Sequence, residues 1–354
     1  DQIYFYFLFI FSIIIFIFYK MNRYSEYGND APAHFLIFFL ISEIIKNFKI
    51  MRMNDLSNYF LIAIFIVMNK VILIVSILFP LVFFLKKKIE FELINKKNLF
   101  ILFFIFLWCI KNTLVSGCIL YPLKETCFKN LSWINLKMTE KVSIENEAWA
   151  KGWPDFRKEE MKVNQKNYIK NFYWLKTWSN NHFLKILKIL LPYLLFLALI
   201  LVFLKKEKMH VEKEKFIKVL SFLSLVGVIL WFLKVPAFRY GYSFIIIFIS
   251  LIFASLTYKL MFNKKNKIVL GISITILLMV FSIKNLNRII FDEKNYFNYP
   301  WPKFYSYEKS NNKKQNNFKI INGEKIYIPN SRYCMFGNAP CGPNDNLKIR
   351  KEKN

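Results

Sequence analysis

The sequence contains few of the residues that phosphate-binding loops and hydrolytic active sites require. Only nine of its 354 residues are glycine, and three are histidine. It has no Gly-rich phosphate loop, no Gly-rich Rossmann turn, no GxSxG and no HExxH. The apolar blocks also lack a ladder of charges, and lack Gly or Pro interruptions in matching halves. These absences argue against nucleotide-dependent enzymes, α/β hydrolases, zinc proteases and inverted-repeat transporters.

Long apolar runs dominate what is present, and hydrophobic residues make up 55% of the chain. About 20 apolar residues are enough to cross roughly 30 Å of hydrocarbon. We therefore predict an all-α integral membrane protein, a bundle of about seven transmembrane helices. The first block has no basic n-region and no small-residue cleavage site, so we interpret it as a span and not as a signal peptide. The predicted spans are residues 3–19, about 60–85, 99–116, 184–204, 216–234, 240–258 and 267–284.

The net charge of +28 would suggest nucleic acid as a partner if the chain were soluble. Here the lysines stand in short runs beside apolar blocks, where they interact with anionic lipid and set the topology. We therefore predict the lipid bilayer as a partner and no nucleic acid. Three connectors contain such lysine runs and are predicted to be cytoplasmic: residues 86–97, 205–215 and 259–267.

Alternation of the spans then divides the chain into four regions. We predict membrane helices with an outer loop at 20–58 within residues 1–116, an outer Trp-rich loop at 117–183, four membrane helices at 184–284 and an outer tail at 285–354. In a bacterial inner membrane, the outer loop domain and the small tail would be periplasmic. A small β-rich element is expected around Phe318 to Ile328.

Two stretches fit this topology poorly. Residues 34–45 are apolar for only about a dozen positions and include Glu43, so we expect them to lie at the interface or to re-enter. The block from Tyr59 to Leu85 is long and contains Asn69 and Lys70. It is either one span or an amphipathic approach helix followed by a span.

Four of the five cysteines form close-spaced pairs in predicted outer segments. Cys118 with Cys127, and Cys334 with Cys341, are predicted disulfides because an oxidising compartment preserves them. A zinc site is the alternative, but neither pair has CxxC spacing or a neighbouring His. Cys109 lies inside an apolar block and is interpreted as a small hydrophobe.

The outer loop before residue 183 is rich in tryptophan. Trp favours membrane interfaces and also stacks on sugar rings. The loop is therefore either an interfacial, partly folded segment or a carbohydrate-binding surface. Its tryptophans are Trp133, Trp149, Trp153, Trp174 and Trp178.

A polar run at residues 23–34 separates two apolar segments and holds the strongest catalytic candidates. Carboxylates at a low-dielectric boundary suit general base work or metal binding, which makes Glu26 and Asp30 candidates. Asp30 has an alternative role as the cap of a helix beginning near Pro32. No such local role is evident for Glu26. His34 is either a proton shuttle or ligand, or an interfacial hydrogen-bonding group.

Arg239 is the only charged residue in a very short predicted outer turn, just after Lys234. Its guanidinium has the fork geometry that binds a phosphate or pyrophosphate at a membrane surface. The alternative is an interfacial anchor whose side chain reaches to the headgroups.

Four ordered motifs resemble an uncharacterised family of bacterial multi-pass membrane proteins associated with surface-polysaccharide gene clusters. They are Ser25–His34, Ser116–Pro122 with Thr126–Cys127, Phe238–Gly241, and Cys334–Cys341. The family itself is a domain of unknown function and is distantly similar to GT-C glycosyltransferases.

That resemblance implies transfer of a sugar from a polyprenyl-phosphate donor on the outer leaflet. A carboxylate would deprotonate the acceptor hydroxyl, and Arg239 would stabilise the departing phosphate. A divalent cation is the only cofactor expected. The other classes considered are a polysaccharide polymerase or flippase, and a non-catalytic scaffold of the assembly complex.

Overall fold

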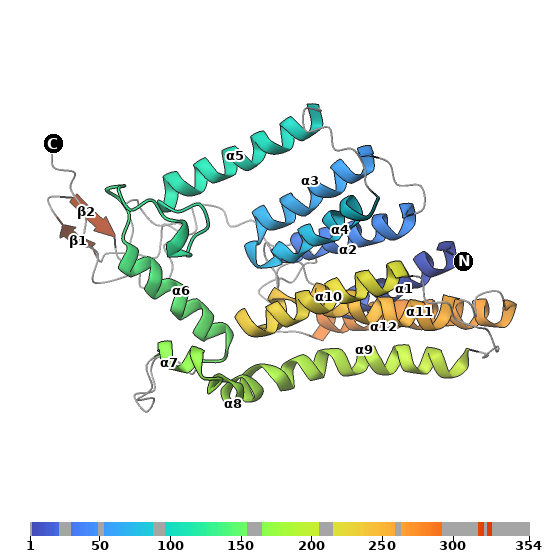
Figure 1. Ribbon diagram of the computed structural model, residues 1–354. Coiled ribbons are helices and arrows are strands. Elements are labelled where there is room, and N and C mark those ends of the chain that lie inside the picture. The colour runs from blue at the N-terminus through green and yellow to red at the C-terminus, as the bar shows by residue number, and fades with distance from the viewer. Residues whose placement is uncertain are drawn as a thin grey trace. The chain divides into compact units, whose positions relative to one another are not determined.

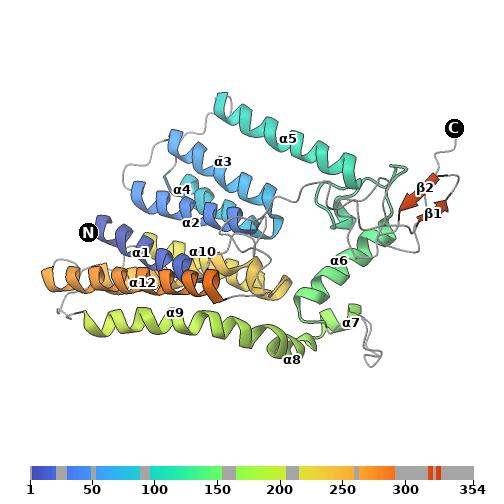
Figure 2. The same ribbon diagram turned by 180° about the vertical axis from the view of Figure 1, so that it is seen from behind.

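The computed structural model is predominantly helical and divides into two units, residues 1–282 and 283–354, which are described separately. Figure 1 shows the chain, and Figure 2 shows it from behind. The structure describes residues 2–20, 30–48, 53–87, 96–153, 165–204, 215–258, 263–291, 318–321 and 324–327. Glu26, Cys334 and Cys341 lie outside these residues.

Helices account for most of the described chain. Those with membrane-like composition are α1 (Gln2–Lys20), α2 (Asp30–Asn47), α3 (Met53–Asn69), η2 (Val71–Ile77), α4 (Leu78–Lys87), α5 (Lys96–Ser116), α9 (Leu184–Phe203), α10 (Lys215–Lys234), α11 (Tyr242–Thr257) and α12 (Lys264–Phe291). The more polar elements are η3 (Lys124–Thr126), α6 (Leu136–Ala150), α7 (Gln165–Lys170), α8 (Trp174–Trp178), η4 (Ser179–Phe183) and η5 (Phe238–Tyr240).

Within the described residues, five helices are long and apolar enough to cross a membrane. This finding is consistent with a multi-pass membrane protein, although it does not reproduce the predicted count of seven spans. Three shorter apolar helices, at residues 55–69, 71–85 and 242–257, accompany them. The five long ones are Gln2–Lys20, Asn98–Ser116, Trp174–Phe203, Phe216–Lys234 and Lys264–Asn287.

The core of the first unit forms where α1 packs on α11, with α2, α9 and α10 beside this pair. Ser12, Tyr193 and Ser250 hydrogen-bond to one another inside it, and the Ser12 and Tyr193 hydroxyl oxygens are 2.7 Å apart. Each hydroxyl comes from a different helix. In an apolar core, such bonds between buried hydroxyls fix how neighbouring helices meet.

Helix α2 differs from the predicted outer loop at residues 20–58, of which it occupies the middle. It is 18 residues long, or about 27 Å, close to the thickness of a hydrocarbon layer. Its apolar side chains pack against α1, α3 and α11, and Ile37, Leu40 and Ile41 are fully buried. The sequence is misleading here because Glu43 interrupts the apolar run, whereas in the helix its carboxylate accepts a hydrogen bond from Asn47 at 3.2 Å.

The long apolar block at residues 60–85 is broken at Lys70. Lys70 has extended backbone angles between α3 and η2, and the chain then turns back along α3. The sequence left two alternatives for this block, one continuous span or an approach helix followed by a span. The break at Lys70 excludes the continuous span. Lys70 and the first turn of α2 meet at one end of the helices. At the other end, the Gln2 side chain donates to the Ile45 carbonyl at 2.7 Å.

The segment between α5 and α9 forms a small cap of η3, α6, α7 and α8 at one end of the long helices (Figures 1 and 2). Lys70 lies at this end, because Trp149 of the cap lies near Arg239, whose carbonyl accepts a hydrogen bond from Lys70. Asn135 begins α6 by accepting a hydrogen bond from the Met138 amide at 3.1 Å. Such a side-chain cap satisfies one of the free amides of a helix start. Ala148, Tyr168 and Trp174 form the buried centre of the cap.

In the second unit, β1 (Phe318–Ile321) pairs antiparallel with β2 (Glu324–Tyr327). Phe318 is opposite Tyr327, and Ile321 is opposite Glu324. The predicted β element near Phe318 to Ile328 is therefore present as a two-stranded hairpin.

Candidate functional site

The turn between α10 and α11 is held in place by two tryptophans. Trp231 donates from its indole nitrogen to the Ala237 carbonyl at 2.9 Å, and Trp178 of α8 donates to the Pro236 carbonyl at 2.7 Å. Gly241 closes the turn against the face of the Trp231 ring, where any Cβ would overlap the indole. The turn that carries Arg239 is therefore fixed to both the bundle and the cap.

Arg239, Asp30 and Lys70 come together at this turn, and we call them the Asp30 cluster. The Lys70 ammonium nitrogen is 2.5 Å from one carboxylate oxygen of Asp30, and the Nε of Arg239 is 3.4 Å from the other. Lys70 also donates to the Arg239 carbonyl at 3.3 Å. One carboxylate thus bridges two cations, which leaves the cluster with a formal charge of +1.

The members of the cluster differ in exposure. The side chains of Lys70 and Asp30 are 10% and 17% exposed, whereas that of Arg239 is 52% exposed. Lys70 and Asp30 therefore interact in a partly desolvated setting, where an unpaired charge is costly. Arg239 can reach a ligand from solvent.

Asp30 is the first residue of α2, so its carboxylate also lies in the first helical turn. A negative charge there interacts favourably with the helix dipole. The predicted cap of a helix beginning near Pro32 is thus itself the first residue of α2, and its role as a site carboxylate stays a prediction.

His34 lies beneath the cluster and is fully buried. Its Nε2 is 2.9 Å from the Arg239 carbonyl oxygen, and its Nδ1 is 2.8 Å from the Ser243 hydroxyl. Because a carbonyl oxygen only accepts, Nε2 carries the proton, and Nδ1 accepts from Ser243. The His34 ring also packs on Tyr242, with centroids 3.9 Å apart. Both nitrogens are engaged, so this geometry makes His34 a positioning residue for Arg239.

Aromatic rings flank the exposed side of the cluster. The Arg239 guanidinium lies 4.8 Å from the Tyr240 ring and 5.7 Å from the Trp149 ring, and Lys70 lies 4.3 Å from the Tyr240 ring. These distances are within cation–π range. Arg239 also donates to the Tyr240 hydroxyl at 2.8 Å.

The tryptophans of the cap differ in exposure. Trp174 is 1% exposed and packs against Phe232 of α10 and beneath the ammonium of Lys151. Trp133 and Trp149 are 49% and 47% exposed. Trp174 therefore packs in the interior of the cap, whereas the rings of Trp133 and Trp149 are accessible at its surface.

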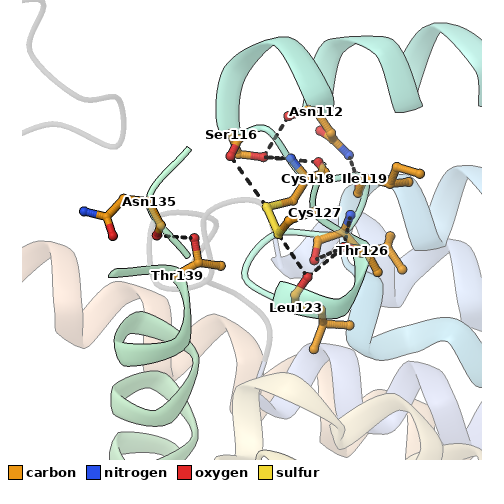
Figure 3. Close-up of a disulfide and its surroundings, with 10 residues drawn as sticks. Asn112, Ser116, Cys118, Ile119, Leu123, Thr126, Cys127, Asn135 and Thr139 are labelled. Atoms are coloured by element: carbon orange, nitrogen blue, oxygen red, sulfur yellow. Dashed lines mark hydrogen bonds between the residues drawn. A yellow bond between two sulfur atoms is a disulfide. The ribbon is translucent and has the colours of Figure 1, made fainter. Parts of the chain in front are cut away.

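A disulfide joins Cys118 and Cys127 in the loop after α5, and Figure 3 shows its surroundings. Asn112 donates to the Ile119 carbonyl at 3.0 Å, and the Thr126 hydroxyl donates to Leu123 at 2.8 Å. The stapled loop is thus anchored to the last turns of α5.

Glu140 of α6 connects this loop to α7. Its carboxylate is 2.7 Å from Lys166 and 2.9 Å from Lys124. Hydrogen bonds from Lys166 and Lys124 lower the pKa of Glu140 to about 2. A cavity of about 310 Å³ lies among these side chains, also lined by Glu147.

The predicted divalent cation finds no obvious ligand set in the described residues, where no three His, Cys, Asp or Glu side chains gather as metal ligands. Asp30 is surrounded by cations instead. Among the described residues, its carboxylate is paired with Lys70 and Arg239.

The described residues form a helical protein whose long apolar helices are consistent with a multi-pass membrane protein, with an ion-pair cluster at one end of the helices. Residues 1–246 match a family model described as a domain of unknown function (DUF8201), and the chain belongs to that family. No curated protein and no solved structure matches it.

The structure brings together three residues that the sequence singled out, Asp30, His34 and Arg239, and adds Lys70, which the sequence analysis did not connect with them. Lys70 is evident in the sequence as a charge within an apolar block. Only the turn after α3 brings it to Asp30. Trp149 was one of five tryptophans in a loop, and its contact with Arg239 separates it from the others.

Proposed function

We propose that this protein is an integral membrane glycosyltransferase-like protein that acts on polyprenyl-phosphate-linked sugars in cell-surface polysaccharide assembly. The observation that carries the proposal is the Asp30 cluster, a carboxylate held between Arg239 and Lys70 at one end of an apolar helix bundle. Such a site can exchange its internal carboxylate for a phosphate that enters from the membrane.

The proposed cycle begins when the lipid phosphate takes the place of the Asp30 carboxylate. Arg239 offers a planar fork that matches phosphate geometry, and Lys70 adds a point charge. Displacement frees the Asp30 carboxylate beside the phosphate-linked carbon of the sugar. In the resting state, Asp30 keeps two partly buried cations paired.

The chemical step then needs one base and one stabilised leaving group. The acceptor hydroxyl oxygen attacks the anomeric carbon, and its proton passes to the Asp30 carboxylate. The bond from the anomeric carbon to the phosphate oxygen breaks, and its electron pair leaves with the polyprenyl phosphate. Arg239 and Lys70 stabilise that negative charge.

We place the Asp30 cluster on the outer face of a bacterial inner membrane. The lysine-rich connectors 86–97 and 205–215 follow the ends of α4 and α9 that are remote from the cap, and such runs favour the cytoplasm. The Cys118–Cys127 disulfide lies at the cap end, in keeping with an oxidising compartment.

Complementation of a deletion strain tests the proposal. Strains that express full-length protein with Asp30→Asn or Arg239→Ala are expected to lose the surface glycan, whereas Lys234→Ala is expected to retain it. Lys234 is a suitable control because it is an exposed cation near the same turn. Normal glycan from both site variants, at wild-type protein levels, would refute the assignment.

A further inference from the structure

Trp149 lies across the Asp30 cluster from the apolar helices. It belongs to α6 in the cap, and its ring is 5.7 Å from the Arg239 guanidinium. The apolar core of α1, α2 and α11 lies on the other side of the cluster, where His34 and Tyr242 are buried. The apolar bundle, the two cations Lys70 and Arg239, and the exposed Trp149 therefore follow one another in this order.

The end of α6 is held by contacts within the cap and to the Arg239 turn. Asn181 of η4 donates to the Gly152 carbonyl at 3.0 Å, directly after α6. The Lys151 ammonium is 2.6 Å from Glu147 and lies 5.0 Å from the Trp174 ring. Trp178 connects the same cap to the Arg239 turn through Pro236. Trp149 is thus fixed in position relative to Arg239.

This order corresponds to the order of groups in a polyprenyl-phosphate sugar, in which the phosphate separates the lipid from the sugar. With the phosphate between Lys70 and Arg239, the lipid points toward the bundle and the next group lies against Trp149. Trp has a large, flat apolar face with little side-chain entropy to lose. Such a face suits the C–H face of a sugar ring.

We infer that Trp149, with Tyr240 beside it, is the sugar-binding platform of the Asp30 cluster and distinguishes a glycosylated polyprenyl phosphate from the bare lipid phosphate. This inference rests on the proposed function and adds the residues that recognise the sugar. Trp149 acts in binding, and the cations hold the phosphate whether or not a sugar is attached.

Equilibrium binding of radiolabelled lipids to the full chain in nanodiscs tests the platform. The probes are a polyprenyl phosphate and the same lipid bearing a hexose, an N-acetylhexosamine or a pentose. The wild type is expected to prefer at least one sugar form by up to roughly tenfold, the upper end of the gain from one aromatic contact. Trp149→Ala is expected to remove that preference, measured as the ratio of the affinities for the sugar-bearing and the bare lipid.

Trp149→Phe keeps an aromatic face and is expected to retain part of the preference. Trp133→Ala removes an equally exposed tryptophan of the cap and is expected to leave it unchanged. If the wild type binds the bare lipid phosphate but shows no sugar preference, or if Trp149→Ala keeps that preference, the platform is refuted and the phosphate site stands. If the wild type binds none of the lipids, the proposed function itself fails.

Discussion

The Nε2 of His34 donates to the carbonyl of Arg239, 205 residues further along the chain, at 2.9 Å. Through this bond the start of α2 fixes the backbone of the short turn before α11. Lys70 donates to the same carbonyl at 3.3 Å. The cluster therefore depends on backbone positioning as well as on charge.

His34→Ala is expected to loosen this turn. The Ser243 hydroxyl would lose its buried acceptor, which typically costs about 1–3 kcal/mol, and the Arg239 carbonyl would keep only its bond from Lys70. The midpoint of thermal unfolding should fall, and binding of polyprenyl phosphate should weaken with it. Ser42→Ala, also in α2, removes only a local bond to Phe39 and should change neither. Unchanged binding by a folded His34→Ala protein would contradict the positioning role.

Asp30→Asn is expected to separate binding from turnover. Without its competing carboxylate, the site should bind polyprenyl phosphate several-fold more tightly, because Lys70 and Arg239 become free for the ligand. Transfer of the sugar should be lost, since the amide cannot accept the proton. Lipid binding and transfer are measured on the same purified protein. Weaker binding would show that Asp30 contributes to holding the lipid and does not compete with it.

Gly241→Ala tests the close approach between the turn and Trp231. The added methyl would overlap the indole ring, and such overpacking costs about 1–3 kcal/mol. Gly271→Ala is the matched control because no atom lies within 4 Å of its Cβ position in α12. There the change should stabilise the helix by about 0.5–1 kcal/mol. Thermal unfolding of both variants gives the comparison, and equal midpoints would contradict the packing argument.

Glu140→Gln is expected to show a pH-dependent effect in the cap. Because Lys166 and Lys124 lower the pKa of Glu140 to about 2, its ionised form stabilises the folded cap above the ordinary carboxyl pKa near 4.5. This contribution is lost as the pH falls from about 4.5 toward 2. Hydrogen exchange in α7 should therefore be faster in the variant than in the wild type at pH 7, and the difference should shrink at pH 3.

Glu145→Gln is the control for that comparison, since its contact with Lys141 is longer, at 3.8 Å. Its exchange should follow the wild type at both values of pH. A difference between Glu140→Gln and the wild type that persists unchanged at pH 3 would show that charge is not its cause.

Hydrophobic patterning predicted the helical fold with apolar helices, and it also predicted the short turn that contains Arg239, because both depend on local sequence. Hydrophobic patterning did not predict that α2 is an 18-residue helix of the core. Glu43 interrupts the apolar pattern, and its hydrogen bond from Asn47 forms only in the helix. Lys70 was visible as a charge in an apolar block. Its meeting with Asp30 depends on the reversal between α3 and η2, which a linear pattern of hydrophobicity does not specify.

Arg239 gives the most direct test of the central claim, that the Asp30 cluster is a phosphate site. Binding of polyprenyl phosphate to the full chain in nanodiscs is measured for the wild type, Arg239→Ala and Lys234→Ala. Loss of a charged hydrogen bond of about 1.5–3 kcal/mol predicts at least roughly tenfold weaker binding for Arg239→Ala. Lys234→Ala should match the wild type. Equal affinity of all three proteins would contradict the account.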